Sequence, residues 1–320
     1  MLTVAIFGAG QLGNGVAALL QAGGRCTVLG PFGRAQRAQA LASGADVVLI
    51  ATTTRFRDVA QDIEIAVRAG SDVLVSAEEC AYPFAVDEQL ARRLDQLAIE
   101  RGVSIAGCGL NPGLIFDALV LTLLGAVPGD CLIEVRRTVD ISGFGTAVLR
   151  RIGIGHSARA FAEAVSRGEV LGHAGFPQSM SVVAAAMGLT LDRITKELQP
   201  VITDSGITLA GRFSIKPGES AGVDQTYTGF IQGTRWFTCH FFGHVDLARI
   251  GKTTADDIEF SRGDAPVQRF QIRPGIMAQM GSQHMLANSV DRIVCAPPGW
   301  RTVAELLPAH PVVPRHTPGP

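Results

Sequence analysis

The N-terminal part of the chain alternates short apolar runs with amphipathic stretches. The runs are strand-like and lie at 3–8, 26–30, 46–51, 72–77 and 103–108. Helical spacing of apolar residues fills the gaps, at 12–22, 35–43, 58–69 and 84–101. Short β-rich runs that alternate with helices are typical of βαβ units. Because the runs are apolar on both sides, they predict a parallel sheet covered on both faces.

The pattern changes after about residue 118. Residues 131–142 alternate apolar and polar positions, and 229–247 read as two strands joined at Gln232-Gly233, with two further strand-like runs before residue 275. This alternation predicts an antiparallel or mixed sheet with one buried face. Helical patterns interrupt the region, at 157–167, 178–187 and 190–198, and a late helix is expected at about 276–294.

These patterns predict an α/β protein with two domains. We expect an N-terminal Rossmann dinucleotide-binding domain at 1–118 and a second α+β domain, built on a mixed sheet, at 119–275. The late segment at about 276–302 is expected to pack back on the first domain. The Pro-rich end of the chain, 309–320, predicts a disordered tail.

Composition narrows the functional class. Of the 320 residues 47% are apolar, which is ample for two cores, and the formal net charge of −1 argues against a nucleic-acid partner or a membrane anchor. No run approaches the roughly 18 apolar residues of a membrane span, and the first residues do not resemble a signal peptide. The six cysteines include no CxxC pair, so we expect no metal site and a reducing, cytoplasmic setting.

A glycine-rich turn opens the first βαβ unit. Gly8, Gly10 and Gly13 form a G-x-G-x-x-G between a strand and a helix, with Gln11 and Leu12 inside the turn. Such a loop lets backbone approach a pyrophosphate and offers it the N–H groups of the helix N-terminus. The motif predicts dinucleotide binding; the alternative is a glycine-rich turn without a ligand.

The residues after the second strand bear on cofactor choice. NAD-binding folds usually carry an acid there for the ribose 2′-hydroxyl, but Gly30 takes that place, and Arg34 and Arg37 follow. Guanidinium groups suit a 2′-phosphate, so NADP(H) is preferred and NAD(H) remains an alternative. The two arginines would otherwise simply begin a solvated helix.

Other candidate residues follow the third, fourth and fifth strands. Thr52 and Thr53 lie at the expected carboxyl edge of the sheet, where ligands bind in such folds, or are ordinary turn formers. Glu78 and Glu79 end the fourth strand, and at most one of these neighbours should reach a substrate as an acid/base. The alternative is a solvated turn. Asn111 lies in a tight loop and could form a hydrogen bond with the nicotinamide amide or with a substrate. The alternative is that it belongs to the N-cap region of a helix.

Five segments together resemble a known family. They read "SAEECAYP", "GCGLNPGLIFDAL", "GHAGFPQSMSVVAAAMG", "AGVDQTYTGFIQG" and "APPGWRTVAEL". Their order and spacing are similar to those of 2,4-diaminopentanoate dehydrogenase and the native amine dehydrogenases, distant kin of dihydrodipicolinate reductase. The resemblance implies a Rossmann domain followed by a substrate and dimerisation domain. It also implies NAD(P)-dependent interconversion of a primary amine with a ketone or aldehyde plus ammonia.

The resemblance also implies roles for single residues. Either Glu78 or Glu79 would handle the ammonia, and Tyr82 would stand near the substrate. His156 and His173 become candidates for a substrate pocket. Segment 136–157 matches the family only in outline. The spaced pair His240 and His244 reads as ordinary strand side chains, because no third metal ligand is evident.

Two further expectations concern assembly and alternatives. The aromatic strand "RWFTCHFF" is too apolar for two solvated faces, which predicts a homodimer through the second sheet. Besides an amine dehydrogenase, the chain could be an NADPH-dependent carbonyl or cyclic-imine reductase without an ammonia step. A dinucleotide-sensing protein without turnover is the third interpretation.

Overall fold

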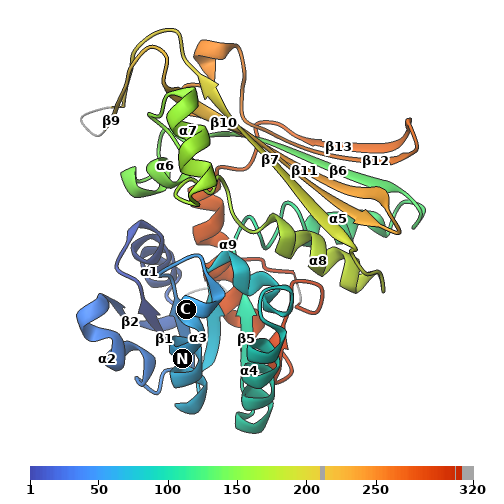
Figure 1. Ribbon diagram of the computed structural model, residues 1–320. Coiled ribbons are helices and arrows are strands. Elements are labelled where there is room, and N and C mark those ends of the chain that lie inside the picture. The colour runs from blue at the N-terminus through green and yellow to red at the C-terminus, as the bar shows by residue number, and fades with distance from the viewer. Residues whose placement is uncertain (210–212, 307, 312–320) are drawn as a thin grey trace, which may run out of the picture. The chain divides into compact units, whose positions relative to one another are not determined.

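The computed structural model describes residues 1–209, 213–306 and 308–311. The chain divides into two compact units (Figure 1). Unit 1 holds Met1–Leu121, Ser181–Met187 and the chain from Gln279 on, and unit 2 holds Thr122–Met180 and Gly188–Ala278. Most of the tail predicted to be disordered, 312–320, lies outside the described residues.

Unit 1 is built on a six-stranded parallel sheet in the order β14-β5-β4-β3-β1-β2. Its strands are β1 (Leu2–Phe7), β2 (Cys26–Phe32), β3 (Val47–Ile50), β4 (Asp72–Val75), β5 (Ser104–Gly107) and β14 (Gly299–Arg301). This sheet confirms the predicted parallel Rossmann architecture. The late segment supplies β14 beside β5 as a sixth strand, where the sequence pattern predicted five.

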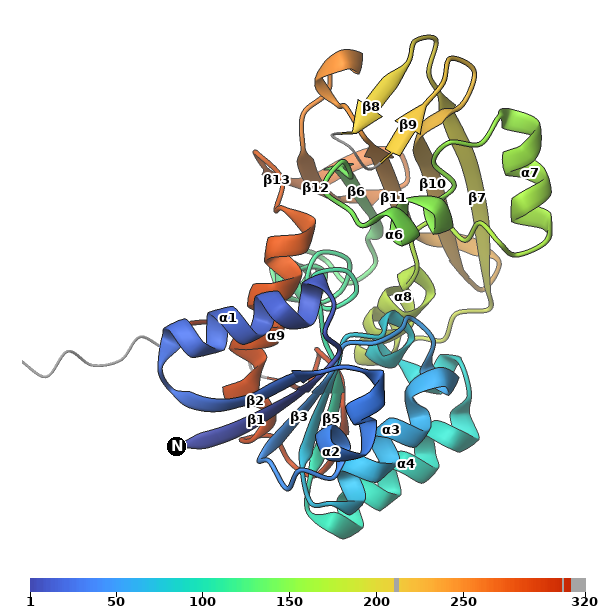
Figure 2. The ribbon, with the colours of Figure 1, turned by 90° about the vertical axis from the view of Figure 1, so that its left-hand side faces the viewer.

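Helices cover both faces of this sheet (Figure 2). On one side lie α1 (Gln11–Gly23) and α9 (Ala278–Ile293), and their apolar residues pack with those of the central strands in one core. On the other side lie α2 (Arg37–Leu41), α3 (Phe56–Arg68) and α4 (Glu88–Arg101), around a second core. The central strands β3, β4 and β5 are almost fully buried because both faces are covered.

Unit 2 is built on a six-stranded mixed sheet in the order β13-β12-β6-β11-β10-β7, in which β6 and β11 are parallel. Its strands are β6 (Leu132–Asp140), β7 (Arg193–Ile202), β10 (Ser220–Ile231), β11 (Thr234–His244), β12 (Ala255–Arg262) and β13 (Ala265–Ile272). A small hairpin joins β8 (Ile207–Leu209) and β9 (Phe213–Ile215). Helices α6 (Thr146–Ile152) and α7 (Ala158–Ser166) belong to unit 2, whereas α5 (Ala118–Leu124) and α8 (Phe176–Ala186) each have residues in both units.

The predicted helix at 190–198 is wrong. Residues Arg193–Ile202 form strand β7, which pairs antiparallel with β10 over nearly its whole length. The local sequence has helical spacing, but the hydrogen bonds of a long neighbouring strand decide the conformation. β7 is the edge strand of its sheet, and Pro200 is tolerated there for that reason.

Three element boundaries also differ from the predictions. β2 runs on to Phe32, beyond the predicted end at Gly30, through an irregularity in its pairing with β1. The helix predicted at 35–43 is a 3₁₀ turn followed by the short α2. The helix predicted from 84 begins only at Glu88, because Asp87 caps it by accepting a hydrogen bond from Leu90 N at 3.2 Å.

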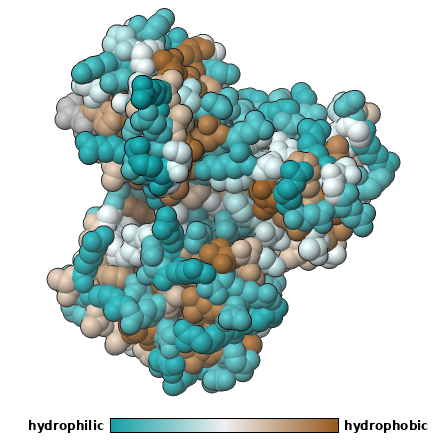
Figure 3. Space-filling model, viewed as in Figure 1, coloured by the Kyte–Doolittle hydropathy of each residue, from teal (hydrophilic) through white to brown (hydrophobic). Residues whose placement is uncertain are grey.

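The aromatic strand of unit 2 is buried within a single chain. Trp236 is 7% exposed, Phe237 0% and Phe241 1%, and β11 lies in the interior of its sheet. In Figure 3 the surface of the strand region, at the upper right, is largely hydrophilic. The argument that this strand needs a partner subunit to cover it therefore does not hold, although the homodimer itself stays a prediction.

Candidate active site

The glycine-rich turn lies between β1 and α1 as predicted. A Cβ on Gly8 would come within 2.2 Å of the Ala51 carbonyl oxygen, and one on Gly13 within 1.9 Å of the Gly8 oxygen. Gly8 also has a φ of 134°. Glycine is therefore required at both positions, since these contacts let β1, α1 and the end of β3 approach one another.

The start of α1 suits a dinucleotide phosphate. Gly10 is exposed and extended, with open space around its Cα. No side chain caps α1 in the described structure, and its first turn, which begins with Gln11 and Leu12, carries no acidic residue. The first N–H groups of a helix need acceptors, and an anion supplies them. These residues fit the phosphates of a nicotinamide cofactor.

Glycine at position 30 has a structural reason. Its φ is 90°, and a Cβ would lie 2.7 Å from Phe32 N. A carboxylate side chain is therefore excluded at this position, and the true end of β2 offers only Gly33 in its place. Neither residue can bind a ribose hydroxyl through a side chain.

The two arginines beyond β2 have different environments. Arg34 is exposed at the start of the 3₁₀ turn. Arg37 is engaged, because its guanidinium lies 2.5 Å from the Asp62 carboxylate and also contacts Gln61. Of the two, Arg34 is the residue left to meet a 2′-phosphate.

The two adjacent glutamates at the end of β4 have different tasks. Both belong to a 3₁₀ turn, Glu78–Ala81. Glu79 turns toward α3, where its Oε2 accepts a hydrogen bond from Phe56 N at 2.8 Å. A carboxylate at a helix N-terminus satisfies a free N–H and complements the helix dipole. Glu79 is thus occupied in holding the start of α3.

Glu78 lines a cavity of about 110 Å³ at the carboxyl edge of the sheet. Polar groups from three other parts of the chain line the same cavity. Ser76 follows β4, Asn111 follows β5, and Ser282 comes from α9. Leu12 of the glycine-rich turn belongs to the same wall, so the acid and that turn border one cavity. Open α/β sheets bind ligands at this edge.

Glycines bring the acidic turn onto the neighbouring strand. A Cβ on Gly107 would lie 2.2 Å from the Cys80 carbonyl group, so the turn holding Glu78 packs directly on the end of β5. In the following loop, Gly113 has a φ of 131° and its backbone approaches Gly109. Buried Asp117 accepts a hydrogen bond from Gly113 N at 2.8 Å. These contacts fix the loop that carries Asn111.

The cavity also contains a cysteine. Burial raises the pKa of the Cys108 thiol to about 11, and its sulfur lies 3.1 Å from the Ser289 hydroxyl. A thiol with that pKa is protonated near neutral pH, so Cys108 does not act as a nucleophile. Glu78 is the ionisable group of this cavity that suits proton transfer.

Sequence reasoning missed the contribution of α9. Ser282 and Leu286 line the cavity of Glu78, and Gln283 donates a hydrogen bond to the Gln11 oxygen at 3.2 Å. The sequence did predict that the late helix packs on the first domain. Its individual residues carried no signal, because a helix separated by about half the chain reaches this edge only through tertiary packing.

Several predicted residues lie elsewhere. Thr53 faces Asp58 of α3 at 3.5 Å, and Thr52 is exposed. Tyr82 stacks edge-on against Phe84 and lies near charged groups of α4, and it is not part of the cavity wall. Burial raises the pKa of its hydroxyl.

His173 has the surroundings of a core residue. Its backbone is paired with the buried Gln225 side chain, and its ring contacts Phe176 and Phe241 with centroids 5.2 and 4.8 Å away. Burial, helped by the nearby positive charges of Arg137 and Arg151, lowers its pKa to about 4. A neutral imidazole follows at physiological pH. His156 lies apart from it, in another cavity of unit 2.

The spaced pair His240 and His244 shows no metal geometry. His240 Nε2 lies 2.7 Å from Asp224 Oδ1 across neighbouring strands. His244 Nδ1 contacts the backbone of Asp246. Among the described residues, no three His, Cys, Asp or Glu side chains converge as metal ligands. Over the same residues, none of the helices combines the length and apolar character needed to cross a membrane.

Comparison with known proteins places the chain in a family. Residues 114–315 match the model of the 2,4-diaminopentanoate dehydrogenase C-terminal domain. A 2,4-diaminopentanoate dehydrogenase of Acetoanaerobium sticklandii is 33% identical over 263 residues, which are 82% of this chain and 74% of that protein. The chain belongs to the 2,4-diaminopentanoate dehydrogenase family. The resemblance inferred from short motifs is thereby confirmed.

Solved structures support the same fold. The amine dehydrogenase of Mycobacterium smegmatis superimposes with a TM-score of 0.83 at 18% identity, covering 97% of both chains. The DAP dehydrogenase of C. glutamicum, in complex with DAP, gives a TM-score of 0.51 at 12% identity and covers 96% of this chain and 94% of its own. At these identities the likeness establishes the fold alone.

Membership of the 2,4-diaminopentanoate dehydrogenase family sets the reaction class. The chain is an oxidoreductase that acts on CH–NH2 donors, and it belongs to a family of NAD(P)-dependent dehydrogenases. The predicted enzyme class is confirmed. The site of unit 1 agrees with it, since a phosphate-binding turn and an acid lie along one edge of one sheet.

Proposed function

We propose that this chain is an NADPH-dependent amine dehydrogenase in which Glu78 is the acid/base. It would interconvert a primary amine with a ketone or aldehyde plus ammonia. The observation that carries the proposal is the division of labour between the neighbouring acids. Glu79 accepts a hydrogen bond from the N-terminus of α3, and Glu78 lines the cavity beside the phosphate loop.

The reaction needs proton transfer at two points. Ammonium must lose a proton before its nitrogen can attack a carbonyl carbon, and the resulting carbinolamine must lose water to give an imine. A single carboxylate that accepts the first proton and returns it to the departing hydroxyl serves both steps. The nicotinamide cofactor supplies the hydride that reduces the imine.

The polar neighbours of Glu78 have positioning roles in this proposal. Ser76, Asn111 and Ser282 come from separate elements and surround the same small volume. Hydroxyl and amide groups there can hold an amine or carbonyl and the nicotinamide amide by hydrogen bonds. A cavity of about 110 Å³ in unit 1 admits the reacting groups, and the body of the substrate must extend beyond it.

Cofactor preference forms a separate part of the proposal. Gly30 and Gly33 present no carboxylate that would repel a 2′-phosphate, and Arg34 is exposed next to them. An NADP(H) preference follows from this charge pattern, with NAD(H) as the weaker cofactor. We also propose a homodimer, as the resemblance to the family implies.

The test is NADPH oxidation by the purified chain across a panel of ketones and aldehydes, each with and without ammonium. The proposal expects oxidation that depends on ammonium and an amine product identified by mass spectrometry. Equal oxidation without ammonium would instead establish a carbonyl or cyclic-imine reductase. NADPH binding without any oxidation across the panel would establish a dinucleotide-sensing protein, and either result would overturn the amine dehydrogenase.

A further inference from the structure

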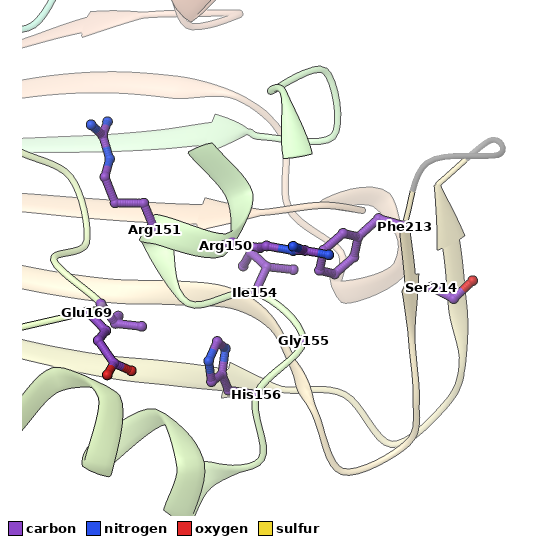
Figure 4. A pocket seen from close by; sticks show the side chains of 9 residues that line it. Arg150, Arg151, Ile154, Gly155, His156, Glu169, Phe213 and Ser214 are labelled. Atoms are coloured by element: carbon purple, nitrogen blue, oxygen red, sulfur yellow. The ribbon is translucent and has the colours of Figure 1, made fainter. Parts of the chain in front are cut away.

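A second cavity lies wholly within unit 2 and shares no residue with the cavity of Glu78 (Figure 4). Its volume is about 750 Å³, within the usual range for small-molecule sites. It is walled by the end of α6, the loop after it, the chain after α7 and strand β9. The lining residues used below are Arg150, Ile154, His156, Glu169, Val170 and Phe213.

The cavity holds an uncompensated positive charge. Arg150 is exposed, and its guanidinium makes no ion pair or hydrogen bond within the part of the chain that the structure describes; its side chain reaches toward the ring of Phe213 (Figure 4). Glu169 is the acid among the described residues of the wall, and Arg167 already binds it through two bonds of 2.8 and 2.9 Å. Those bonds hold the pKa of the Glu169 carboxyl below its ordinary value, so its charge is matched by Arg167.

A buried nitrogen in the same wall lacks a partner. His156 Nδ1 is inaccessible to solvent and has no hydrogen bond. The ring itself can turn about its side-chain bonds, whereas the His156 backbone is fixed by Ser220. Its N–H donates to the Ser220 hydroxyl at 3.2 Å, and its oxygen accepts from Ser220 N at 2.7 Å. A buried polar atom left without a bond is costly, and a ligand oxygen in the cavity would satisfy Nδ1 once the ring turned toward it.

The donors in this cavity favour a carboxylate over a phosphate. Phosphate sites rely on free backbone N–H groups. Here Gly155 N already donates to the Ser220 backbone oxygen, and His156 N donates to the Ser220 hydroxyl. A guanidinium fork binds the oxygens of either group, so the lack of free backbone N–H groups at these two positions is what favours a carboxylate. Buried Ile154 and Val170, together with Phe213, add an apolar surface.

We propose that this cavity binds a small organic acid, with its carboxylate on Arg150 and His156 and its apolar body against Phe213. The site belongs to unit 2 alone and does not rest on the proposed amine dehydrogenase function. Binding is therefore measured directly and separately from turnover.

The test uses benzoate as the probe in titration calorimetry with the full chain, kept saturated with NADP⁺ to fill the dinucleotide phosphate site. Benzamide is the neutral analogue, and phenyl phosphate is the phosphate analogue. We expect benzoate to bind at least about tenfold more tightly than either analogue. Arg150→Gln and His156→Phe should each weaken benzoate by about tenfold or more, the usual scale of a lost charge-assisted contact.

Arg159→Gln is the matched control, because it removes the same charge from the solvent-exposed ion pair with Glu163 on α7, outside the cavity. Its benzoate affinity should stay within about twofold of the wild type. Unchanged affinity in both Arg150→Gln and His156→Phe would overturn the proposal, as would phenyl phosphate binding more tightly than benzoate. Thermal melts of all variants identify any loss of binding that comes from unfolding.

Discussion

Replacing each of the two adjacent glutamates by glutamine should separate catalysis from stability. Glu78 lines the cavity next to the phosphate loop, whereas Glu79 holds Phe56 N at the start of α3. Glutamine keeps the size of the side chain and one acceptor oxygen, but removes the charge and the ability to take a proton. The two variants should therefore fail in different measurements.

For Glu78→Gln we expect a rate of ammonium-dependent NADPH oxidation about 10²–10⁴-fold below the wild type, the usual worth of general acid–base catalysis. NADPH affinity should change little, because the phosphates are assigned to the Gly8–Gly13 turn. The melting temperature should change less than in Glu79→Gln, because glutamine keeps the size and hydrogen-bonding capacity of the side chain.

For Glu79→Gln we expect a loss of stability. Removing a charge from a helix N-terminus costs about 0.3–1 kcal/mol, and Glu79→Ala, which also removes the acceptor of Phe56 N, should cost about 1–2 kcal/mol. In a protein of this size 1 kcal/mol corresponds to roughly 2–4 °C in melting temperature. Turnover should fall much less than in Glu78→Gln.

The assay is the rate of NADPH oxidation at saturating ammonium, paired with a thermal melt of every variant. Near-normal turnover in Glu78→Gln would refute the catalytic assignment. A loss of turnover in Glu79→Gln that equals or exceeds the loss in Glu78→Gln, without a change in melting temperature, would refute the division of roles between the two acids.

Three further predictions concern the cofactor, assembly and pH. In a fluorescence titration NADPH should bind at least about tenfold more tightly than NADH. Arg34→Ala should reduce this difference in affinity, and Arg37→Ala should leave the difference unchanged. Equal affinities of the wild type for the two cofactors would contradict the prediction. Light scattering at micromolar concentration should show a homodimer, and a monomer would exclude it. Burial lowers the pKa of His173 to about 4 in the folded chain, whereas in the unfolded chain the imidazole takes up a proton near pH 6.5. Between these two pH values the unfolded chain is protonated at His173 and the folded chain is not. Stability should therefore fall by up to about 3 kcal/mol as pH drops from 6.5 to 4, and His173→Phe should flatten that part of the unfolding curve; identical curves would refute it.

The sequence by itself determined the architecture of unit 1 and the position of its edge. Alternating strands and helices, with Gly8, Gly10 and Gly13 in a strand–turn–helix context, predicted a parallel sheet with a glycine-rich turn between its first strand and first helix. These signals are local, because strand period, helix period and turn glycines each act within a few residues. The same holds for placing Glu78 and Glu79 at the carboxyl end of a strand.

Only the tertiary structure decided which acid faces the cavity. Glu79 is drawn away by Phe56 N, more than twenty residues earlier in the chain, and Ser282 joins the site from α9 near the other end. Residues 190–198 became a strand because β10 offered ten residues of pairing, and a local pattern cannot include that partner. The side chains of the aromatic strand are likewise buried by other segments of the same chain, such as His173 and Phe176 against Phe241. Contacts between distant segments lower the free energy of a conformation that the local sequence alone does not favour.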